Sequence, residues 1–140
     1  MERPTPIDEE YIFDDGIIIS ETDLKGIITY SNRKFCEISG YDKSELKGKS
    51  HNIVRHPDMP KSAFKNLWDT IQDGKSWVGT VKNLRKDGRY YWVYTFISPI
   101  FKEKKIIGYT AARKPASRTE IEEAKMAYEK SLREENQIKE

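Results

Sequence analysis

Two kinds of hydrophobic spacing divide this chain. Five short segments have the β-branched or alternating composition of strands, and turn residues separate them: 16–21, 26–31, 77–83, 89–101 and 106–113. The first two predict a β-hairpin around the turn at 22–26. The last three predict a meander, with Asp-Gly at 87–88 as one of its turns.

Helical spacing fills the gap between these two groups of strands. Residues 32–40 predict a short helix that Asn32 or Ser31 caps and Gly40 ends, and residues 42–48 predict a further helical turn. After Pro60, hydrophobic residues recur at helical intervals up to Gly74: Ala63, Phe64, Leu67, Trp68 and Ile71. The order of elements predicts an α+β fold, a five-stranded antiparallel sheet with short helices packed on one face.

The two ends of the chain differ in composition from its middle. Residues 1–11 contain prolines and charges and predict a flexible N-terminal segment. Residues 12–114 hold the predicted strands and form the folded domain. After Pro115, a capping box at 117–120 and strong helix formers predict a polar helix with a thin apolar stripe. We interpret residues 115–140 as a C-terminal helical linker rather than a loosely docked tail.

The stretch 50–60 (SHNIVRHPDMP) concentrates more chemistry than any other part of the chain. It contains both histidines, an arginine and an aspartate. Pro57 and Pro60 restrict the backbone, so we expect a constrained loop with a helix beginning near Pro60, which Asp58 is placed to cap. Polar and ionisable groups on a stiff, irregular backbone indicate a binding site for a ligand or a partner.

Composition narrows the classes of function. A net charge of +2 over 140 residues does not favour nucleic-acid binding. The single cysteine, Cys36, excludes an internal disulfide and a cysteine-based metal site, and it fits a reducing cytoplasm. No apolar run reaches the length of a membrane span or a secretory leader. We expect a cytoplasmic protein, either free or held at the inner face of the membrane through a receptor or partner.

An enzyme is not expected. Two histidines and one cysteine, without paired carboxylates at a recognisable site, leave no nucleophile and base in a catalytic arrangement. The chain also lacks a glycine-rich loop of the mononucleotide or dinucleotide type.

Several motifs together resemble those of a known sensor family. Residues 26–32 (GIITYSN), 35–41 (FCEISGY) and 45–48 (ELKG) resemble the opening of a PAS domain, and 86–92 (KDGRYYW) and 107–109 (IGY) its closing strands. This resemblance covers residues 12–114. Within PAS domains, the motif HNIVRHPDMP, with the aromatic residues and the VKN at 81–83 that follow it, resembles the aerotaxis and energy-taxis receptors. The resemblance implies a domain that binds FAD without a covalent bond. It also implies that redox or oxygen state is reported to the chemotaxis machinery, through a receptor signalling domain in the same or a separate chain.

An isoalloxazine ring requires flat apolar walls and a few amides at its pyrimidine edge. Phe64, Trp68 and Trp77 are suitable for the walls, and Asn32 and Asn83 for the amides. Each also has a structural interpretation. The aromatic residues can belong to the core, Asn32 can cap its helix, and Asn83 can face solvent from a strand.

The diphosphate of FAD requires cationic donors. Arg55 can bind it with two hydrogen bonds, and His56 can add another. The negative charge of Asp58 would repel a phosphate, so we expect Asp58 to orient Arg55 or His56, or to meet a ribose hydroxyl. By resemblance, these three residues are expected to matter for FAD, while His51 is either a ligand contact or a structural histidine.

Other kinds of PAS domain provide the alternatives. A light-sensing flavin domain needs a cysteine in the loop beside the ring, and Cys36 lies outside residues 50–58. Haem-binding PAS domains use an axial histidine, which keeps His51 and His56 as candidates for haem. A small metabolite, or a ligand-free PAS domain that acts only as a homodimerisation module, also stays open.

Overall fold

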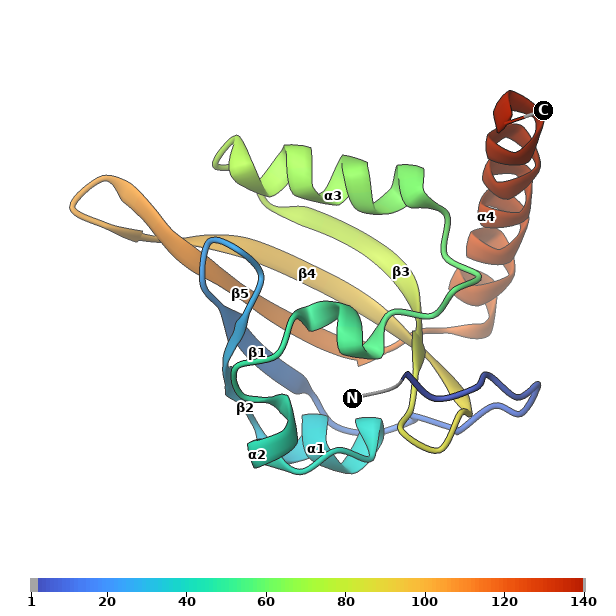
Figure 1. The fold of residues 1–140 in the computed structure, drawn as a ribbon, viewed down its shortest axis with the longest axis horizontal. Helices are drawn as coiled ribbons and strands as arrows, with labels where there is room; N and C mark the ends of the chain where they lie inside the picture. The colour runs from blue at the N-terminus through green and yellow to red at the C-terminus, as the bar shows by residue number, and fades with distance from the viewer. Residues whose placement is uncertain (1–2, 140) are drawn as a thin grey trace.

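The strands and helices follow one another in the order that the hydrophobic spacing predicts (Figure 1). The computed structural model describes residues 3–139. The strands are β1 (Ile18–Thr22), β2 (Ile28–Ser31), β3 (Trp77–Leu84), β4 (Tyr90–Lys102) and β5 (Lys105–Pro115). The helices are α1 (Arg33–Ser39), α2 (Lys43–Leu46), the short 3-10 helix η1 (His51–Val54), α3 (Lys61–Gln72) and α4 (Arg118–Lys139). The predicted α+β class and five-stranded antiparallel sheet are confirmed.

Pairing of β1 with β5 joins the N-terminal hairpin to the C-terminal meander, so the strand order is β2-β1-β5-β4-β3. In this register, Arg113 of β5 lies opposite Ile18 of β1 on one side and Thr95 of β4 on the other. Thr95 in turn lies opposite Gly79 of β3. Because directly opposed residues share a face of the sheet, these four positions form one row across it.

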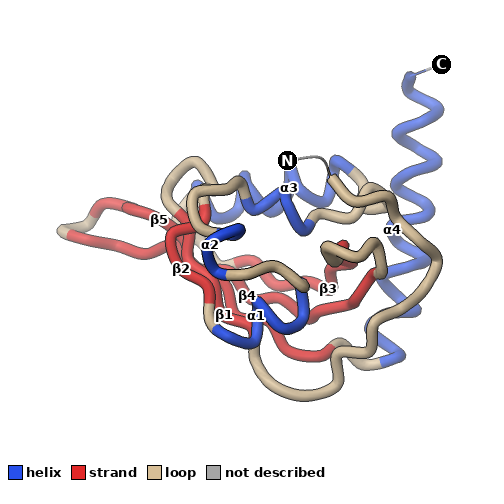
Figure 2. Tube along the Cα trace, turned by 60° about the horizontal axis from the view of Figure 1, so that its bottom comes forward, coloured by secondary structure: helices blue, strands red, loops and turns tan. Residues whose placement is uncertain are grey.

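The two faces of the sheet are covered by different helices. On the inner face, α1, η1 and α3 lie over the strands, and the main core includes Ile18, Phe35 and Val93. On the outer face, Ile121 and Ala124 of α4 bury Trp92. Figure 2 shows α3 lying along the sheet and α4 standing at one end, with the β4–β5 hairpin projecting at the other.

Residues 3–11, which we predicted to be a flexible N-terminal segment, make hydrogen bonds to the folded domain, and their flexibility stays a prediction. Their backbone pairs with β4 and its preceding turn, through Ile7 N–H to Gly88 O (2.9 Å) and Tyr11 N–H to Tyr90 O (2.7 Å). The Arg3 guanidinium donates to the carbonyl oxygens of Asn52 and Arg55. These partners are distant in sequence, so composition alone could not indicate them. Residues 1 and 2 of the predicted segment lie outside the described residues.

The C-terminal helix begins with the predicted capping box. Ser117 Oγ accepts from the Glu120 N–H at 3.1 Å, and the Glu120 carboxylate accepts from the Ser117 N–H at 2.8 Å. Further along α4, the Tyr128 hydroxyl donates to the Thr80 carbonyl of β3. A linker role for residues 115–140 stays a prediction, and residue 140 lies outside the described part of the chain. Between residues 3 and 139, no helix has both the length and the apolar character that a membrane span needs.

The C-terminal helix also reaches the first turn of α3. The Glu135 carboxylate accepts from the Lys61 N–H at 3.0 Å and from Ser62 Oγ at 3.2 Å. Pro60 stands at the cap position of α3 without a side-chain cap, and Asp58, which we expected to cap this helix, does not do so. A carboxylate from a distant helix therefore satisfies an amide that the local sequence leaves free.

Asn32 is fully engaged inside the fold. Its Oδ1 accepts from the N–H groups of Phe35 and Ile19, both at 3.0 Å, and its Nδ2 donates to the Ile17 carbonyl at 3.0 Å. The side chain therefore caps α1 and ties that helix to β1.

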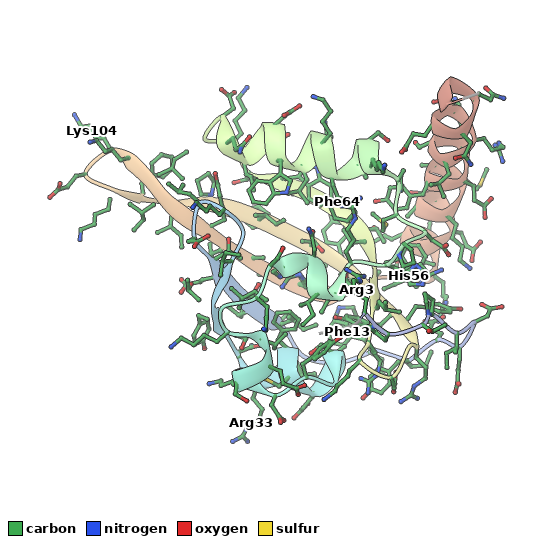
Figure 3. All side chains as sticks on the ribbon, in the orientation of Figure 1. Arg3, Phe13, Arg33, His56, Phe64 and Lys104 are labelled. Carbon is green, nitrogen blue, oxygen red and sulfur yellow. The ribbon has the colours of Figure 1, made fainter. Side chains whose placement is uncertain are left out.

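We expect Asn32→Ala to lower the free energy of unfolding by about 1–2 kcal/mol, because it removes the cap of α1. Urea denaturation monitored by circular dichroism measures the change. Arg33→Ala is the matched control, since Arg33 belongs to the same helix and its side chain points to solvent (Figure 3). Equal stability of the two variants would contradict the structural role of Asn32.

Candidate functional site

A cavity of about 290 Å³ lies between α3 and the inner face of the sheet. Its walls come from four strands, from η1 and from α3, so segments distant in sequence share it. The predicted site residues that line it are His51, Arg55, Phe64, Trp68 and Asn83.

The helix α3 supplies much of the apolar wall. Phe64, Leu67, Trp68 and Ile71 recur at intervals of three and four residues, which places them on one side of the helix. The Trp68 ring meets the Tyr109 ring of β5 edge to face, with centroids 5.6 Å apart. The apolar face that the helical spacing predicted for α3 therefore lies against the cavity.

The opposite part of the cavity wall is polar and buried. Arg113 is 5% exposed and lines the cavity from β5. Its Nη1 donates to Ser20 Oγ of β1 at 3.1 Å, and its Nη2 donates to His51 Nε2 at 2.7 Å. The His51 ring stacks on Phe35 of α1 at 5.6 Å between centroids. A cation is thus held inside the domain by groups from three other segments.

The charge of Arg113 is not balanced nearby. Burial lowers the pKa of its guanidinium to about 10, so it stays charged at neutral pH. Within residues 3–139, it forms no ion pair with a carboxylate. Burial, and then the charge of Arg113, lower the pKa of His51 to about 3. His51 is therefore neutral, and since Arg113 can only donate, His51 Nε2 accepts and the ring proton lies on Nδ1.

Thr95 adds an unused polar atom to the same part of the wall. It lies opposite Arg113 in the sheet, is 2% exposed, and lines the cavity. Its Oγ1 has no hydrogen-bond partner in the described chain. Buried hydroxyl groups are normally paired, so an unpaired one in a cavity wall indicates a place for a ligand atom or an ordered water.

Arg55 places a second cation at the cavity, next to the edge strand β3. Its backbone forms an isolated antiparallel bridge with Asn83, and its guanidinium carbon lies 3.8 Å from the centroid of the Phe64 ring. Burial, and then the charge of Arg3, lower the pKa of Arg55, while the charge of Glu135 raises it.

His56 and Asp58 lie away from the cavity. Arg55 is in extended conformation, in which successive side chains point to opposite sides, so His56 points away from the cavity. The His56 ring is 3% exposed and meets Tyr90 edge to face, and its Nδ1 accepts from the Asp58 N–H at 3.0 Å. The Asp58 carboxylate pairs with Lys82 at 2.9 Å. Burial, followed by the charge of Lys82, lowers the pKa of His56 to about 4.

Trp77 and Asn32 also lie outside the cavity lining. The Trp77 ring folds back over Gly79, where a Cβ would approach it to 2.5 Å, and its Nε1 donates to Asn66 of α3 at 2.9 Å. Trp77 therefore joins β3 to α3. Asn32 acts through α1, the helix that carries the Phe35 ring beneath His51.

Sequence reasoning missed the polar residues of the buried wall, Ser20, Thr95 and Arg113. The signal for Arg113 was available, because the alternation of β5 puts 109, 111 and 113 on one face and gives the last an inward position. Cys36 is not among the cavity-lining residues. In the described part of the chain, no group of three or more His, Cys, Asp or Glu side chains could hold a metal ion.

Comparisons with known proteins agree with this architecture. A sequence profile of the PAS fold matches residues 28–113. The aerotaxis receptor of Escherichia coli (strain K12) is 48% identical over 108 residues, which is 77% of this chain and 21% of the receptor. The chain therefore spans about one fifth of the length of that relative.

Solved structures show the same fold. The dark-state structure of the blue-light photoreceptor Aureochrome1 LOV has a TM-score of 0.68 at 20% identity, over 85% of this chain and 84% of that one. A light-oxygen-voltage domain solved in a study of a flavin analogue has a TM-score of 0.65 at 21% identity, over 89% of this chain and 87% of that one. At these identities the likeness concerns the fold alone. The profile and the receptor match show that the chain belongs to the PAS fold family and matches the PAS domain of the aerotaxis receptor family.

Proposed function

We propose that this chain is a redox- or oxygen-sensing PAS domain that binds FAD without a covalent bond and signals to the chemotaxis machinery. The observation that carries the proposal is an apolar cavity containing a buried, unbalanced guanidinium and an unpaired hydroxyl. An interior charge of this kind is costly unless a ligand or water compensates it. The identity to an aerotaxis receptor supports the choice of signal.

The dimensions and chemistry of the site fit a flavin. The cavity volume of about 290 Å³ is just below the usual range of small-molecule sites, which is roughly 300–1,000 Å³. A planar ring can therefore occupy the interior while the remainder of a dinucleotide continues past the mouth. Phe64 and Trp68 offer flat apolar surface, and Asn83 offers an amide on β3. Arg55 would bind the diphosphate.

The remaining predicted residues would act through the loop. His56 and Asp58 fix the chain on the side of β3 away from the cavity, through the Asp58–Lys82 pair and the His56–Tyr90 contact. Their loss would displace Arg55, because one short segment carries all three residues. Asn32 and Trp77 would affect flavin binding indirectly, because they fix the positions of α1 and α3.

Haem and photochemical alternatives receive less support. His51 Nε2 already accepts from Arg113, and His56 lies outside the cavity lining, so neither ring offers a free nitrogen to an iron there. A cysteinyl adduct needs a thiol beside the ring, and the cavity-lining residues include no cysteine. The proposed domain is a receptor component in the cytoplasm and not an enzyme.

The signal would leave the domain through α4. Reduction of a bound flavin changes the charge and protonation of its ring. Arg55 is subject to the charge of Glu135, and Glu135 holds the first turn of α3 to α4. Because Phe64 and Trp68 of α3 line the cavity, a shift of α3 against the altered ring would change the docking of α4. That change would act on a receptor signalling domain in the same or a separate chain, or on a second copy of this domain.

The absorbance of the purified protein tests the ligand. We expect two flavin bands that dithionite bleaches, and a yellow cofactor that denaturation releases as FAD, because the bond is non-covalent. A sharp Soret band, or a colourless protein that acquires no flavin from added FAD, would contradict the proposal.

Variants of the loop and of a distant site make this test specific. Arg55→Ala and Asp58→Ala are expected to lose most of the flavin. Lys104→Ala removes a charge at the tip of the β4–β5 hairpin, far from Phe64 (Figure 3), and is expected to retain it. Equal flavin content in all three variants would contradict the assignment of the loop.

Glu135→Ala tests the contact between α4 and α3. Loss of a helix cap costs about 0.5–2 kcal/mol, so the amides of Lys61 and Ser62 and the last turns of α4 should exchange hydrogen faster. Hydrogen–deuterium exchange measured by mass spectrometry gives the rates. Glu134→Ala is the control, since Glu134 is exposed on the same helix. Equal exchange rates in α3 for the two variants would show that Glu135 does not couple α4 to α3.

A further inference from the structure

The exposed part of the cavity wall marks the mouth of the cavity. Most lining residues are buried or half-buried, and the exposed ones are Lys25, Ser50 and Asn52. The His51 N–H donates to the Gly26 carbonyl oxygen at 2.9 Å, so the turn before β2 and the loop before α3 meet here. The cavity therefore meets solvent at the junction of these two segments.

A segment from the N-terminus crosses the domain to reach this mouth. We call residues 3–7 the N-terminal strap. Its far end is fixed at the turn before β4, where the Ile7 N–H donates to the Gly88 carbonyl oxygen at 2.9 Å. The strap lies so close to this turn that a Cβ on Gly88 would approach the Thr5 carbonyl oxygen to 2.4 Å. The strap is thus attached to the β3–β4 turn, on a part of the chain distant in sequence from the mouth.

The other end of the strap holds the loop at the mouth. The Arg3 guanidinium donates to the carbonyl oxygens of Asn52 and Arg55, both at the C-terminal end of η1 (Figure 3). Carbonyl oxygens at such a helix end have acceptor capacity that the helix itself does not use. Asn52 and Arg55 also line the cavity. One side chain therefore fixes two points of the segment that separates the cavity from solvent.

This contact belongs to the parts of the fold that open most readily. Arg3 is exposed, and hydrogen bonds that compete with water contribute little net stability. Burial, and then the charge of Arg3, lower the pKa of Arg55, so the two cations repel each other while Arg3 holds the loop. Segments with few buried contacts open locally at small cost in free energy.

We propose that the N-terminal strap is a gate, in which Arg3 holds the loop 52–55 over the mouth of the cavity and thereby sets how fast a ligand enters and leaves. Release of Arg3 frees the loop to move away from the mouth. This inference rests on the proposed flavin function for the ligand that reports on the gate. Arg3 is a positioning residue in this account, because it acts on the loop and not on the ligand.

The rates of flavin binding distinguish a gate from a ligand contact. A gate scales both rate constants by the fraction of time that the mouth is open, so removing it speeds association and dissociation alike and leaves the dissociation constant nearly unchanged. We expect Arg3→Met to raise both rates roughly threefold to thirtyfold, as for the loss of one or two exposed hydrogen bonds. We expect the same factors for FAD and for riboflavin, because the gate does not recognise phosphate.

Stopped-flow quenching of flavin fluorescence measures association to the flavin-free protein, and displacement measures dissociation. Arg33→Met is the matched control, since it removes the same charge from a side chain that points to solvent (Figure 3) and is expected to leave both rates unchanged. Circular dichroism of both variants should match that of the wild type, because neither side chain is buried.

Hydrogen–deuterium exchange of the flavin-free protein tests the gate without a ligand. We expect the amides of residues 52–56 to exchange roughly threefold to thirtyfold faster in Arg3→Met than in Arg33→Met, because Arg3 no longer holds the loop. Amides of β4 and β5 in the sheet should exchange equally in the two variants.

Several results would overturn this inference. Faster dissociation with unchanged association would make Arg3 a ligand contact, and a change for FAD alone would make it a phosphate contact. Equal exchange of residues 52–56 in the two variants would show that Arg3 does not hold the loop. A wild-type protein that binds neither flavin would contradict the proposed function, and the exchange of the loop would still decide whether Arg3 closes the mouth.

Discussion

One buried charge, the guanidinium of Arg113, determines how the interior of this domain is arranged. Desolvating it is unfavourable, and the protein offsets that cost with hydrogen bonds that Arg113 donates to Ser20 and His51 instead of an ion pair. These bonds join β5 to β1 and to η1, and the stacked Phe35 ring adds α1. The same contacts that stabilise the charge therefore form the polar wall of the cavity. A domain that keeps such a charge without a carboxylate is suited to a ligand that accepts hydrogen bonds.

Because the loop before α3 pairs with the edge strand β3, its successive side chains point to opposite sides and have different functions. The bridge between Arg55 and Asn83 fixes the loop in extended conformation, so Arg55 faces the cavity and His56 faces the opposite side. There the Asp58–Lys82 pair holds the segment in place. The next turn begins α3, whose first amide is capped by Glu135 of α4. A single short segment thus links the cavity, the edge of the sheet and the C-terminal helix.

Much of the fold could be predicted from the sequence because hydrophobic spacing is a local property. The spacing of Phe64 and Trp68 placed both on the inner side of α3, and the alternation of β3 placed Asn83 inside. The polar wall could not be predicted in the same way, since Arg113 lies 93 residues from Ser20 and 62 from His51. We assigned Trp77 to the ligand because the sequence does not show that its ring folds back over Gly79, two residues later. That contact is visible only in three dimensions. Glu135, a distant cap of α3, was hidden for the same reason.

The central claim is that the cavity containing the buried guanidinium of Arg113 binds a flavin, and NMR of the protein labelled with ¹⁵N-arginine tests it most directly. The side-chain N–H signals of Arg113 are assigned by their absence in Arg113→Lys. On addition of riboflavin, we expect these signals to shift and their exchange with water to slow. Unchanged Arg113 signals in a protein saturated with riboflavin would contradict the account.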